Sequence, residues 1–129
     1  MYYPYSQQDF LLAPEEKVRV NIYLQLVLEY GYPAECITME RKVKMGSGYK
    51  YVDIVIFRTK AQTQGGDMIL VECKRSKVSA NAFKEAEKQG FSYEYQLRCS
   101  DYLWVNSGDR NSYYRIKPDK KKGRKFIPI

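Results

Sequence analysis

Hydrophobic positions follow a helical spacing in two segments of the chain. Residues 14–30 begin with a proline and two glutamates, which suit the first turn of a helix, and continue with closely spaced aliphatic residues. A Gly-Tyr-Pro sequence then ends the segment. Residues 79–98 place apolar or small side chains at intervals of three and four. The spacing therefore predicts two helices, each with one face for packing against a sheet.

Other segments have the apolar, partly alternating pattern that is typical of strands. Residues 37–44 and 49–58 are joined by a Met-Gly-Ser-Gly turn, which predicts a hairpin. Residues 68–74 predict a third strand, and residues 102–105 and 113–116 predict two shorter ones. A parallel crossover through the second helix would make the sheet mixed. The expected fold is an α/β domain with an α-β-β-β-α-β core, a mixed sheet flanked by helices.

Size and composition predict one globular domain. The chain has 129 residues, of which 44% are hydrophobic and 29% charged. We expect a single domain over residues 1–129, with residues 1–12 as an N-terminal arm and residues 117–129 as a basic C-terminal tail. No apolar run is long enough to span a bilayer, and the first residues lack the features of a signal peptide. The expected location is the cytoplasm, without a membrane anchor.

Positive charge exceeds negative charge, and the excess is concentrated near the C-terminal end. Lys and Arg total 22 against 15 for Asp and Glu, which gives a formal net charge of +7. This balance favours a polyanionic partner such as DNA or RNA, although a solvated tail explains it as well. If DNA is bound, the residues expected to contact phosphates are Lys117, Lys120, Lys121, Lys122, Arg124 and Lys125.

Cysteine and histidine usage narrows the possible chemistry. The three cysteines, Cys36, Cys73 and Cys99, have no Cys-x-x-Cys spacing, so we expect buried, reduced thiols and not a disulfide framework or a zinc site. The chain has no histidine, which removes the commonest general base and the commonest transition-metal ligand. Hydrolysis by this chain would have to rely on carboxylates, lysine and hard metal ions.

Two of the strand-like segments each hold one acidic residue among apolar ones. Asp53 lies in the second strand, where alternation places it on the same face as Val55 and Phe57. Glu72 lies at the end of the third strand and shares a face with Lys74. Isolated carboxylates are rarely buried unless they are paired or bound to a metal. If the two strands are neighbours, Asp53 approaches the pair formed by Glu72 and Lys74.

Such a group of side chains suits metal-dependent phosphodiester chemistry. The carboxylates of Asp53 and Glu72 and the backbone carbonyl of Cys73 are oxygen ligands of the kind that Mg²⁺ or Mn²⁺ prefers. Lys74 can orient the attacking water or offset charge in the transition state. The alternative for Glu72 and Lys74 is a salt-bridged, solvated strand end without a catalytic role.

The residues and their spacing resemble the PD-(D/E)xK nucleases, and among them the N-terminal nuclease domain of type I restriction enzyme endonuclease (R) subunits. The resemblance is found in residues 14–19, 29–33, 52–57 and 69–74 and in the pair Gln89 and Tyr93. It implies a restriction-endonuclease-like mixed sheet and Mg²⁺-dependent cleavage of DNA, with Asp53, Glu72 and Lys74 at the metal and the water. Val52 stands where the family label has a proline.

The resemblance also implies roles for residues outside the two strands. The first-helix glutamate of the family corresponds to Glu16, or less securely to Glu15, as a further catalytic residue and metal ligand. The family's Gln-x-x-x-Tyr motif corresponds to Gln89 and Tyr93. These two side chains share one helix face and would hold a DNA phosphate beside the metal. Packing against the core is the alternative for both.

The sequence leaves the wider context open. It contains no phosphate-binding loop of an ATP-dependent motor, so the chain is either a fragment of a larger enzyme or a free-standing relative. The expected partners are DNA and, in a restriction system, helicase and methyltransferase or specificity subunits. Two other functions remain possible: a non-catalytic nucleic-acid-binding subunit, and a junction-resolving or repair nuclease of the same fold.

Overall fold

A computed structural model describes residues 14–60, 67–97, 100–108, 110–119 and 123–129. The helical elements are α1 (Pro14–Leu24), a π-helical turn η2 (Gln25–Glu29), a 3₁₀ turn η3 (Ala34–Cys36) and α2 (Ala80–Leu97). The strands are β1 (Ile37–Met45), β2 (Gly48–Phe57), β3 (Asp67–Cys73), β4 (Tyr102–Asn106), β5 (Asn111–Asp119) and β6 (Gly123–Pro128). In this described part of the chain, no helix combines the length and the apolar character needed to cross a membrane.

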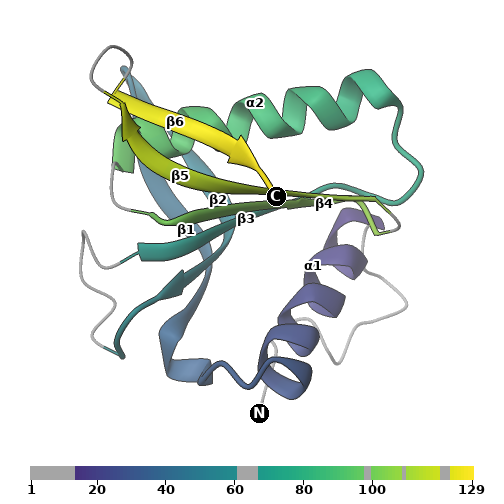
Figure 1. Ribbon diagram of the computed structural model, residues 1–129. Coiled ribbons are helices and arrows are strands. Elements are labelled where there is room, and N and C mark those ends of the chain that lie inside the picture. The colour runs from purple at the N-terminus through teal and green to yellow at the C-terminus, as the bar shows by residue number, and fades with distance from the viewer. Residues whose placement is uncertain (1–13, 61–66, 98–99, 109, 120–122) are drawn as a thin grey trace.

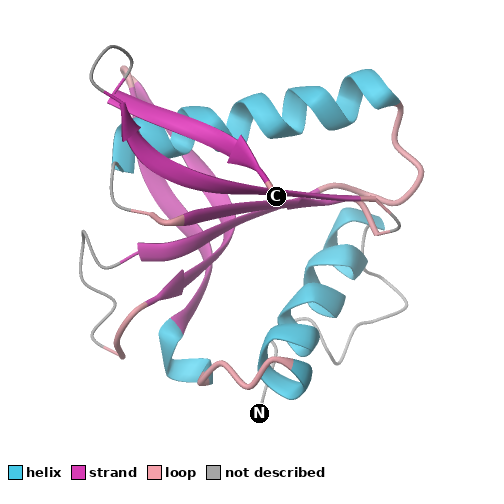
Figure 2. Ribbon diagram, viewed as in Figure 1, coloured by secondary structure: helices cyan, strands magenta, loops and turns pink. Residues whose placement is uncertain are grey.

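The strands form one six-stranded mixed sheet in the order β1-β2-β3-β4-β5-β6. Strands β3 and β4 are parallel and are connected through α2, while every other neighbouring pair is antiparallel. Helix α1 lies against one face of the sheet and α2 against the other (Figures 1 and 2). The expected α/β fold with a mixed sheet between helices is therefore confirmed.

Each face of the sheet has its own hydrophobic core. Ile54, Ile56, Val71 and Cys73 pack toward α1, together with the apolar face of that helix. On the other face, Leu70 belongs to the core that contains the apolar residues of α2. Because side chains alternate along a strand, Glu72, which follows Leu70 by two residues on β3, also lies on the α2 side. The end of β3 thus divides its side chains between the two helices.

Close packing of α2 on the sheet depends on Gly90. A β-carbon at this position would lie 2.8 Å from each of two methyl groups of Leu103, a residue of β4 that is only 1% exposed. Glycine costs about 1 kcal/mol relative to alanine inside a helix. The absence of a side chain here lets the α2 backbone approach β4, which fixes the position of the helix over the sheet.

The C-terminal segment differs from the expected tail. Residues 113–116 were expected as a short strand, but β5 extends from Asn111 to Asp119 and β6 pairs with it antiparallel, with Lys117 opposite Lys125. Residues 123–128 are therefore part of the sheet and not an appended tail. Phe126 supplies the physical reason, since it packs on Phe91 of α2 with ring centroids 4.2 Å apart. Residues 120–122 and the expected N-terminal arm lie outside the described residues.

Two of the three cysteines, Cys36 and Cys73, lie among the described residues. Cys36 and Cys73 are buried free thiols, as expected, and Cys99 lies outside the described residues. Burial and the nearby negative charges of Asp53 and Glu72 raise the pKa of the Cys73 thiol well above its ordinary value. The Cys73 side chain therefore stays protonated and serves as an apolar core group.

Candidate active site

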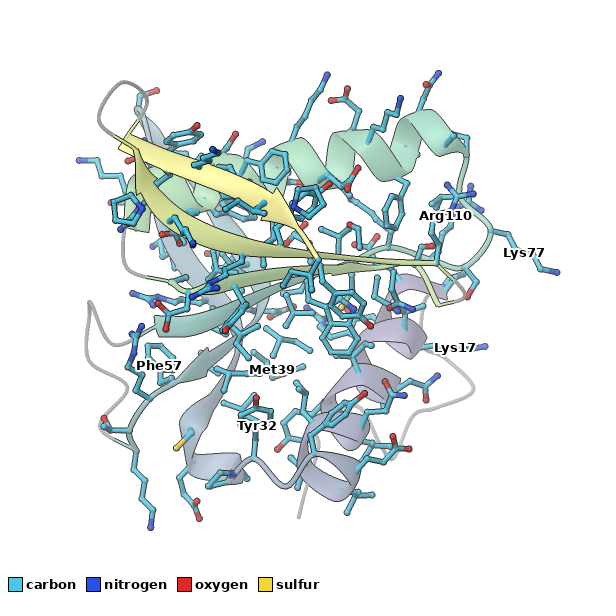
Figure 3. All side chains as sticks on the ribbon, in the orientation of Figure 1. Lys17, Tyr32, Met39, Phe57, Lys77 and Arg110 are labelled. Atoms are coloured by element: carbon cyan, nitrogen blue, oxygen red, sulfur yellow. The ribbon has the colours of Figure 1, made fainter. Side chains whose placement is uncertain are left out.

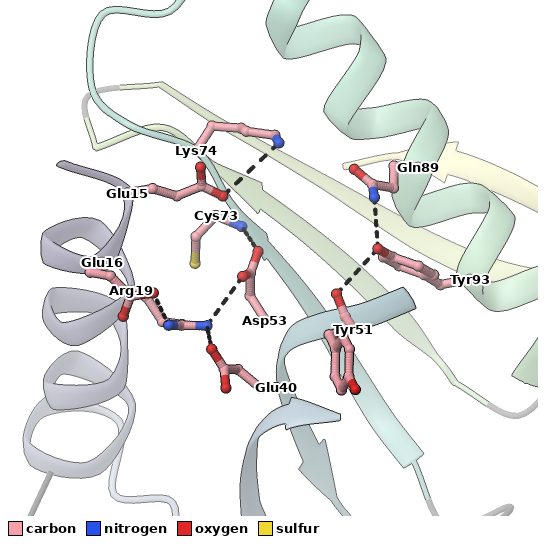
Figure 4. Close-up of polar contacts among 10 residues, drawn as sticks. All are labelled: Glu15, Glu16, Arg19, Glu40, Tyr51, Asp53, Cys73, Lys74, Gln89 and Tyr93. Carbon is pink, nitrogen blue, oxygen red and sulfur yellow. Dashed lines mark hydrogen bonds and ion pairs between the residues drawn. The ribbon is translucent and has the colours of Figure 1, made fainter. Parts of the chain in front are cut away.

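Asp53 and Cys73 meet where the pairing of β2 and β3 ends. The last paired residues of these strands on this side are Ile54 and Val71. Beyond them, the backbone N–H of Cys73 donates a hydrogen bond to Oδ2 of Asp53 at 2.8 Å (Figure 4). A side-chain carboxylate thus satisfies a strand N–H at the edge of the ladder. This bond fixes the Asp53 carboxylate beside the end of β3, next to Glu72.

The regular alternation of β2 is broken at Asp53. Val52 packs in the core on the α2 side and Ile54 in the core on the α1 side, although residues two apart on a regular strand share a face. On β1, the residue opposite this break is Glu40, between the pairs Met39–Ile54 and Arg41–Val52. Glu40 has a φ of 54°, a left-handed conformation that costs of order 1–3 kcal/mol for a residue other than glycine.

This break changes where Asp53 points. Alternation predicted that Asp53 would share a face with Val55 and Phe57, which belong to the core on the α2 side. The Asp53 carboxylate instead lies between the Cys73 N–H and Arg19 of α1 (Figure 4). That expectation was wrong because the strained backbone at Glu40 and the irregular β2 turn the carboxylate out of the regular pleat.

Glu72 is buried next to this carboxylate. Its side chain is 3% exposed, and its Oε1 atom has no hydrogen-bond partner among the described residues. Burial and the negative charge of Asp53 raise the pKa of Glu72 well above its ordinary value. Burial also raises the pKa of Asp53, while the Cys73 N–H and the Arg19 guanidinium act in the opposite direction. A buried and a half-buried carboxylate side by side, with one oxygen free, are an arrangement that a bound cation would stabilise.

Arg19, to which the sequence pattern assigned no role, lies at the centre of an ion-pair network. The residue is 4% exposed and its guanidinium contacts three carboxylates. Nη2 meets Glu16, and Nη1 lies 3.0 Å from Oε1 of Glu40 and 3.6 Å from Oδ1 of Asp53. A signal was present in the sequence, because Arg19 falls on the buried stripe of α1 that includes Ile22. A charge within an apolar stripe requires partners, and here they are Glu16 on α1 itself, Glu40 on β1 and Asp53 on β2.

Lys74 follows β3 and faces Glu15. The backbone N–H of Lys74 donates a hydrogen bond to the carbonyl of Asn106 at 2.8 Å, which extends the parallel pairing of β3 with β4. Its Nζ lies 4.0 Å from Oε1 of Glu15, and the Lys74 side chain is 31% exposed. The charge of Glu15 also contributes to raising the pKa of Asp53. Of the two first-helix glutamates, the structure therefore brings Glu15 toward the centre, whereas Glu16 is engaged by Arg19.

Gln89 and Tyr93 form a hydrogen-bonded pair on α2. Nε2 of Gln89 donates to the Tyr93 hydroxyl at 2.7 Å, and that hydroxyl donates to the carbonyl of Tyr51 at 3.2 Å (Figure 4). Tyr93 is 1% exposed, so its ring packs in the core. This agrees with the alternative in which the side chain packs against the core. Burial and then the charges of Glu72 and Asp53 raise the pKa of Tyr93, which places its hydroxyl in the field of the two carboxylates. Gln89 is half-buried.

The basic residues near the C-terminus lie away from this centre. Arg124 Nε is 3.4 Å from Oε1 of Glu94, which is completely buried, and the Tyr95 hydroxyl donates to the Arg124 carbonyl at 3.5 Å. Arg124 is thus engaged in an ion pair with a buried carboxylate, at a position where the sequence predicted a phosphate contact. Lys117 and Lys125 are exposed on β5 and β6. Lys120, Lys121 and Lys122 lie outside the described residues.

A metal ion would have few side-chain ligands at this centre. Among the described residues, no three acidic or cysteine side chains come together closely enough to hold a metal ion. The ligands would be the carboxylates of Asp53 and Glu72 and the backbone carbonyl of Cys73, with water completing the shell. The free Oε1 of Glu72, next to the Asp53 carboxylate, supplies oxygen ligands of the kind that a hard divalent cation prefers.

Comparison with known proteins gives one result. Residues 14–128 match the family described as Type I restriction enzyme R protein N terminus (HSDR_N). No curated protein and no solved structure matches the chain. The match spans all of the described helices and strands, from the first residue of α1 to the last residue of β6. The resemblance to type I restriction enzyme R subunits, which was inferred from the sequence, is therefore confirmed.

Proposed function

Because the chain belongs to the family of type I restriction enzyme R protein N termini, we propose that it is a Mg²⁺-dependent or Mn²⁺-dependent DNA endonuclease domain. The observation that supports this most directly is the buried carboxylate of Glu72, which has one free oxygen and lies next to the half-buried Asp53 and beside Lys74. A buried unpaired carboxylate costs stability, so such a pair is maintained where it has a use.

The cation would be held by Asp53, Glu72 and the Cys73 carbonyl. When bound, it would polarise the phosphodiester, lower the pKa of a water molecule and offset developing charge. The protein prepares this site through its own contacts. The Cys73 N–H and Arg19 each hold one oxygen of Asp53 and favour its ionised form, so the carboxylate is oriented before any ligand arrives.

Lys74 would act as a fixed cation near the reacting phosphate. Its exposed ion pair with Glu15, at 4.0 Å, is weak, so the ammonium group can turn from the glutamate toward an incoming phosphate. Gln89 would position the phosphate from the side opposite Lys74. Its amide is held in place by the Tyr93 hydroxyl. In a restriction system, the domain would act together with a helicase motor and with methyltransferase or specificity subunits.

One observation favours a non-catalytic nucleic-acid-binding subunit as the second candidate. The Arg19 guanidinium already neutralises Asp53, and no three acidic side chains of the described residues gather around a metal position. Under this alternative, Arg19 takes the place of a cation and the fold serves binding alone. The two candidates differ in whether Mn²⁺ binds the protein.

The test is cleavage of duplex, single-stranded and branched DNA with Mg²⁺ or Mn²⁺, combined with a Mn²⁺ titration of the protein alone. We expect Asp53→Asn, Glu72→Gln and Lys74→Ala to lower the cleavage rate by about 100-fold or more. The two carboxylate variants should also weaken Mn²⁺ binding, while Lys74→Ala should not. Glu35→Gln and Lys84→Ala change exposed residues outside the site and are the matched controls.

Cleavage that persists in purified Glu72→Gln protein would contradict the proposed site. A native protein that binds DNA but neither binds Mn²⁺ nor cuts any substrate would establish the non-catalytic alternative. Preference for branched over linear duplex DNA would instead indicate a junction-resolving or repair nuclease.

A further inference from the structure

A basic groove opens between α2 and the turn that joins β1 to β2. It has a volume of about 830 Å³, and its lining includes Lys50, Lys74, Arg75, Ser79, Lys88 and Gln89. Lys74 and Gln89 are the two side chains that the proposed chemistry places beside the scissile phosphate. The groove therefore begins at the candidate centre and continues along the N-terminal part of α2.

The charges of this groove suit a chain of phosphates. Four cationic residues line it, against the two acidic residues Glu15 and Glu85. Each of these acids already faces a lysine, with Glu85 3.4 Å from Lys88 and Glu15 4.0 Å from Lys74. Exposed ion pairs of this kind contribute about 0–1 kcal/mol, so a phosphate can replace the carboxylate at little cost.

Arg75 connects this groove with a second one on the other face of the sheet. The second groove, of about 790 Å³, runs along α1 and is lined by Lys17, Asn106, Asn111 and Arg75 itself. The two grooves thus meet immediately after Lys74. Lys17 and Lys77 extend outward at this same end of the molecule, where the Arg110 guanidinium also lies, over the ring of Phe83 (Figure 3). A nucleic-acid backbone that follows both grooves would cross the candidate centre.

The basic β5–β6 hairpin lies on a different flank of α2. Residues 82, 85, 86, 88, 89 and 92 of the helix line the groove, whereas residues 87, 91 and 95 meet the hairpin through Tyr114 and Phe126. With 3.6 residues per turn, these two sets occupy different flanks of the helix, and Lys88 is the groove residue nearest the hairpin flank. Neither Lys117 nor Lys125 lines the groove, because they alternate with Ile116 and Phe126, which pack toward α2, and so point away from that helix.

We propose that a DNA strand runs through the α2 groove, with Lys50, Arg75 and Lys88 as its phosphate contacts, and that Lys117 and Lys125 of the β5–β6 hairpin are not part of the DNA-binding surface. The inference rests on the proposed nuclease function, because the groove leads to Lys74. For Lys117 and Lys125 it replaces the expectation from charge clustering, which placed phosphate contacts at these residues.

The test compares two pairs of lysines in EDTA, where binding is measured without cleavage. Anisotropy of a labelled duplex is recorded against salt concentration for the full chain, for Lys50→Ala with Lys88→Ala, and for Lys117→Ala with Lys125→Ala. We expect the groove pair to reduce the slope of log affinity against log salt by about 0.9 for each phosphate that is no longer neutralised, and the hairpin pair to leave it unchanged. Arg75→Ala should behave like one groove substitution.

An unchanged slope in the groove pair, or a reduced slope in the hairpin pair alone, would overturn the inference, as would a native chain that binds no DNA. Cleavage assays on the same proteins separate this result from the chemistry. A chain that binds through the groove but cuts nothing with Mg²⁺ contradicts the proposed nuclease and leaves the DNA path intact. Cleavage combined with binding through the hairpin contradicts the path alone.

Discussion

Nη1 of Arg19 lies 3.6 Å from Oδ1 of Asp53, so a cation from the first helix reaches the carboxylate whose other oxygen accepts the Cys73 N–H. The same nitrogen lies 3.0 Å from Glu40, whose left-handed backbone faces Asp53 across the β1–β2 ladder. Helix α1 and the central hairpin are thus joined at the candidate site by one buried guanidinium. Arg19 therefore helps to hold α1 on the sheet and also supplies positive charge beside the Asp53 carboxylate.

Arg19 is therefore predicted to be a positioning residue for Asp53. Arg19→Gln leaves carboxylates without their buried counter-charge and should lower the free energy of unfolding by about 3–5 kcal/mol. Loss of the guanidinium also raises the pKa of Asp53 further, so the midpoint of Mn²⁺ binding against pH should move upward. Arg19→Lys keeps the charge and should restore part of the shift. A purely structural role would change stability but leave the pH midpoint of Mn²⁺ binding where it is.

Glu72 should make the metal-free protein less stable as pH rises. Its raised pKa means that the folded protein binds this proton more tightly than the unfolded chain, in which the pKa is about 4.3. Stability is then lost as pH rises from the unfolded pKa toward the folded one. Glu72→Gln should be more stable than the native chain near neutral pH and should depend less on pH.

Denaturant unfolding in EDTA between about pH 5 and about pH 8 measures this dependence. Glu85→Gln, which changes an exposed carboxylate, should retain the native pH dependence. A Glu72→Gln protein with the native pH profile would show that burial of Glu72 carries no desolvation penalty. Added Mg²⁺ should stabilise the native chain and not the Glu72→Gln variant, because the ion binds only the folded site.

Gln89 should affect catalysis more than stability. Its amide holds the Tyr93 hydroxyl and faces the groove, so Gln89→Ala should lower the cleavage rate by roughly 10 to 100-fold with little change in melting temperature. Tyr93→Phe removes a buried hydroxyl that donates to the Tyr51 carbonyl and should cost about 1–3 kcal/mol of stability. A Gln89→Ala protein that is destabilised yet fully active per folded molecule would remove Gln89 from the site.

Arg124 should be required for stability and not for DNA binding. Arg124→Ala leaves the completely buried Glu94 without its ion pair, which should lower the free energy of unfolding by about 3 kcal/mol. DNA affinity of the folded fraction should not change. Lys125→Ala is the control, since its side chain is exposed on the same strand. Weaker DNA binding by folded Arg124→Ala protein would return the hairpin to the binding surface.

Local sequence pattern was sufficient for most of the elements and for the chemical type of the site. The 3.6-residue and two-residue periods act over one segment at a time, so they located α1, α2 and the first three strands within a few residues. The acidic residues Asp53 and Glu72 stood out because each interrupts an apolar strand. A strand that follows a helix crossover also predicted the parallel pairing of β3 and β4.

Tertiary structure alone decided which charges meet. Arg19 and Asp53 are far apart in sequence and come together only when α1 packs on the sheet, which no local period describes. The break in β2 and the strained Glu40 arise from the pairing of two strands, and they reversed the face assigned to Asp53. Likewise, residues 123–128 were expected as part of a basic tail, but the contacts of Phe126 with Phe91 and of Arg124 with the buried Glu94 hold them in the sheet as β6. Charge clusters are visible in the sequence, but burial and ion pairing depend on long-range contacts.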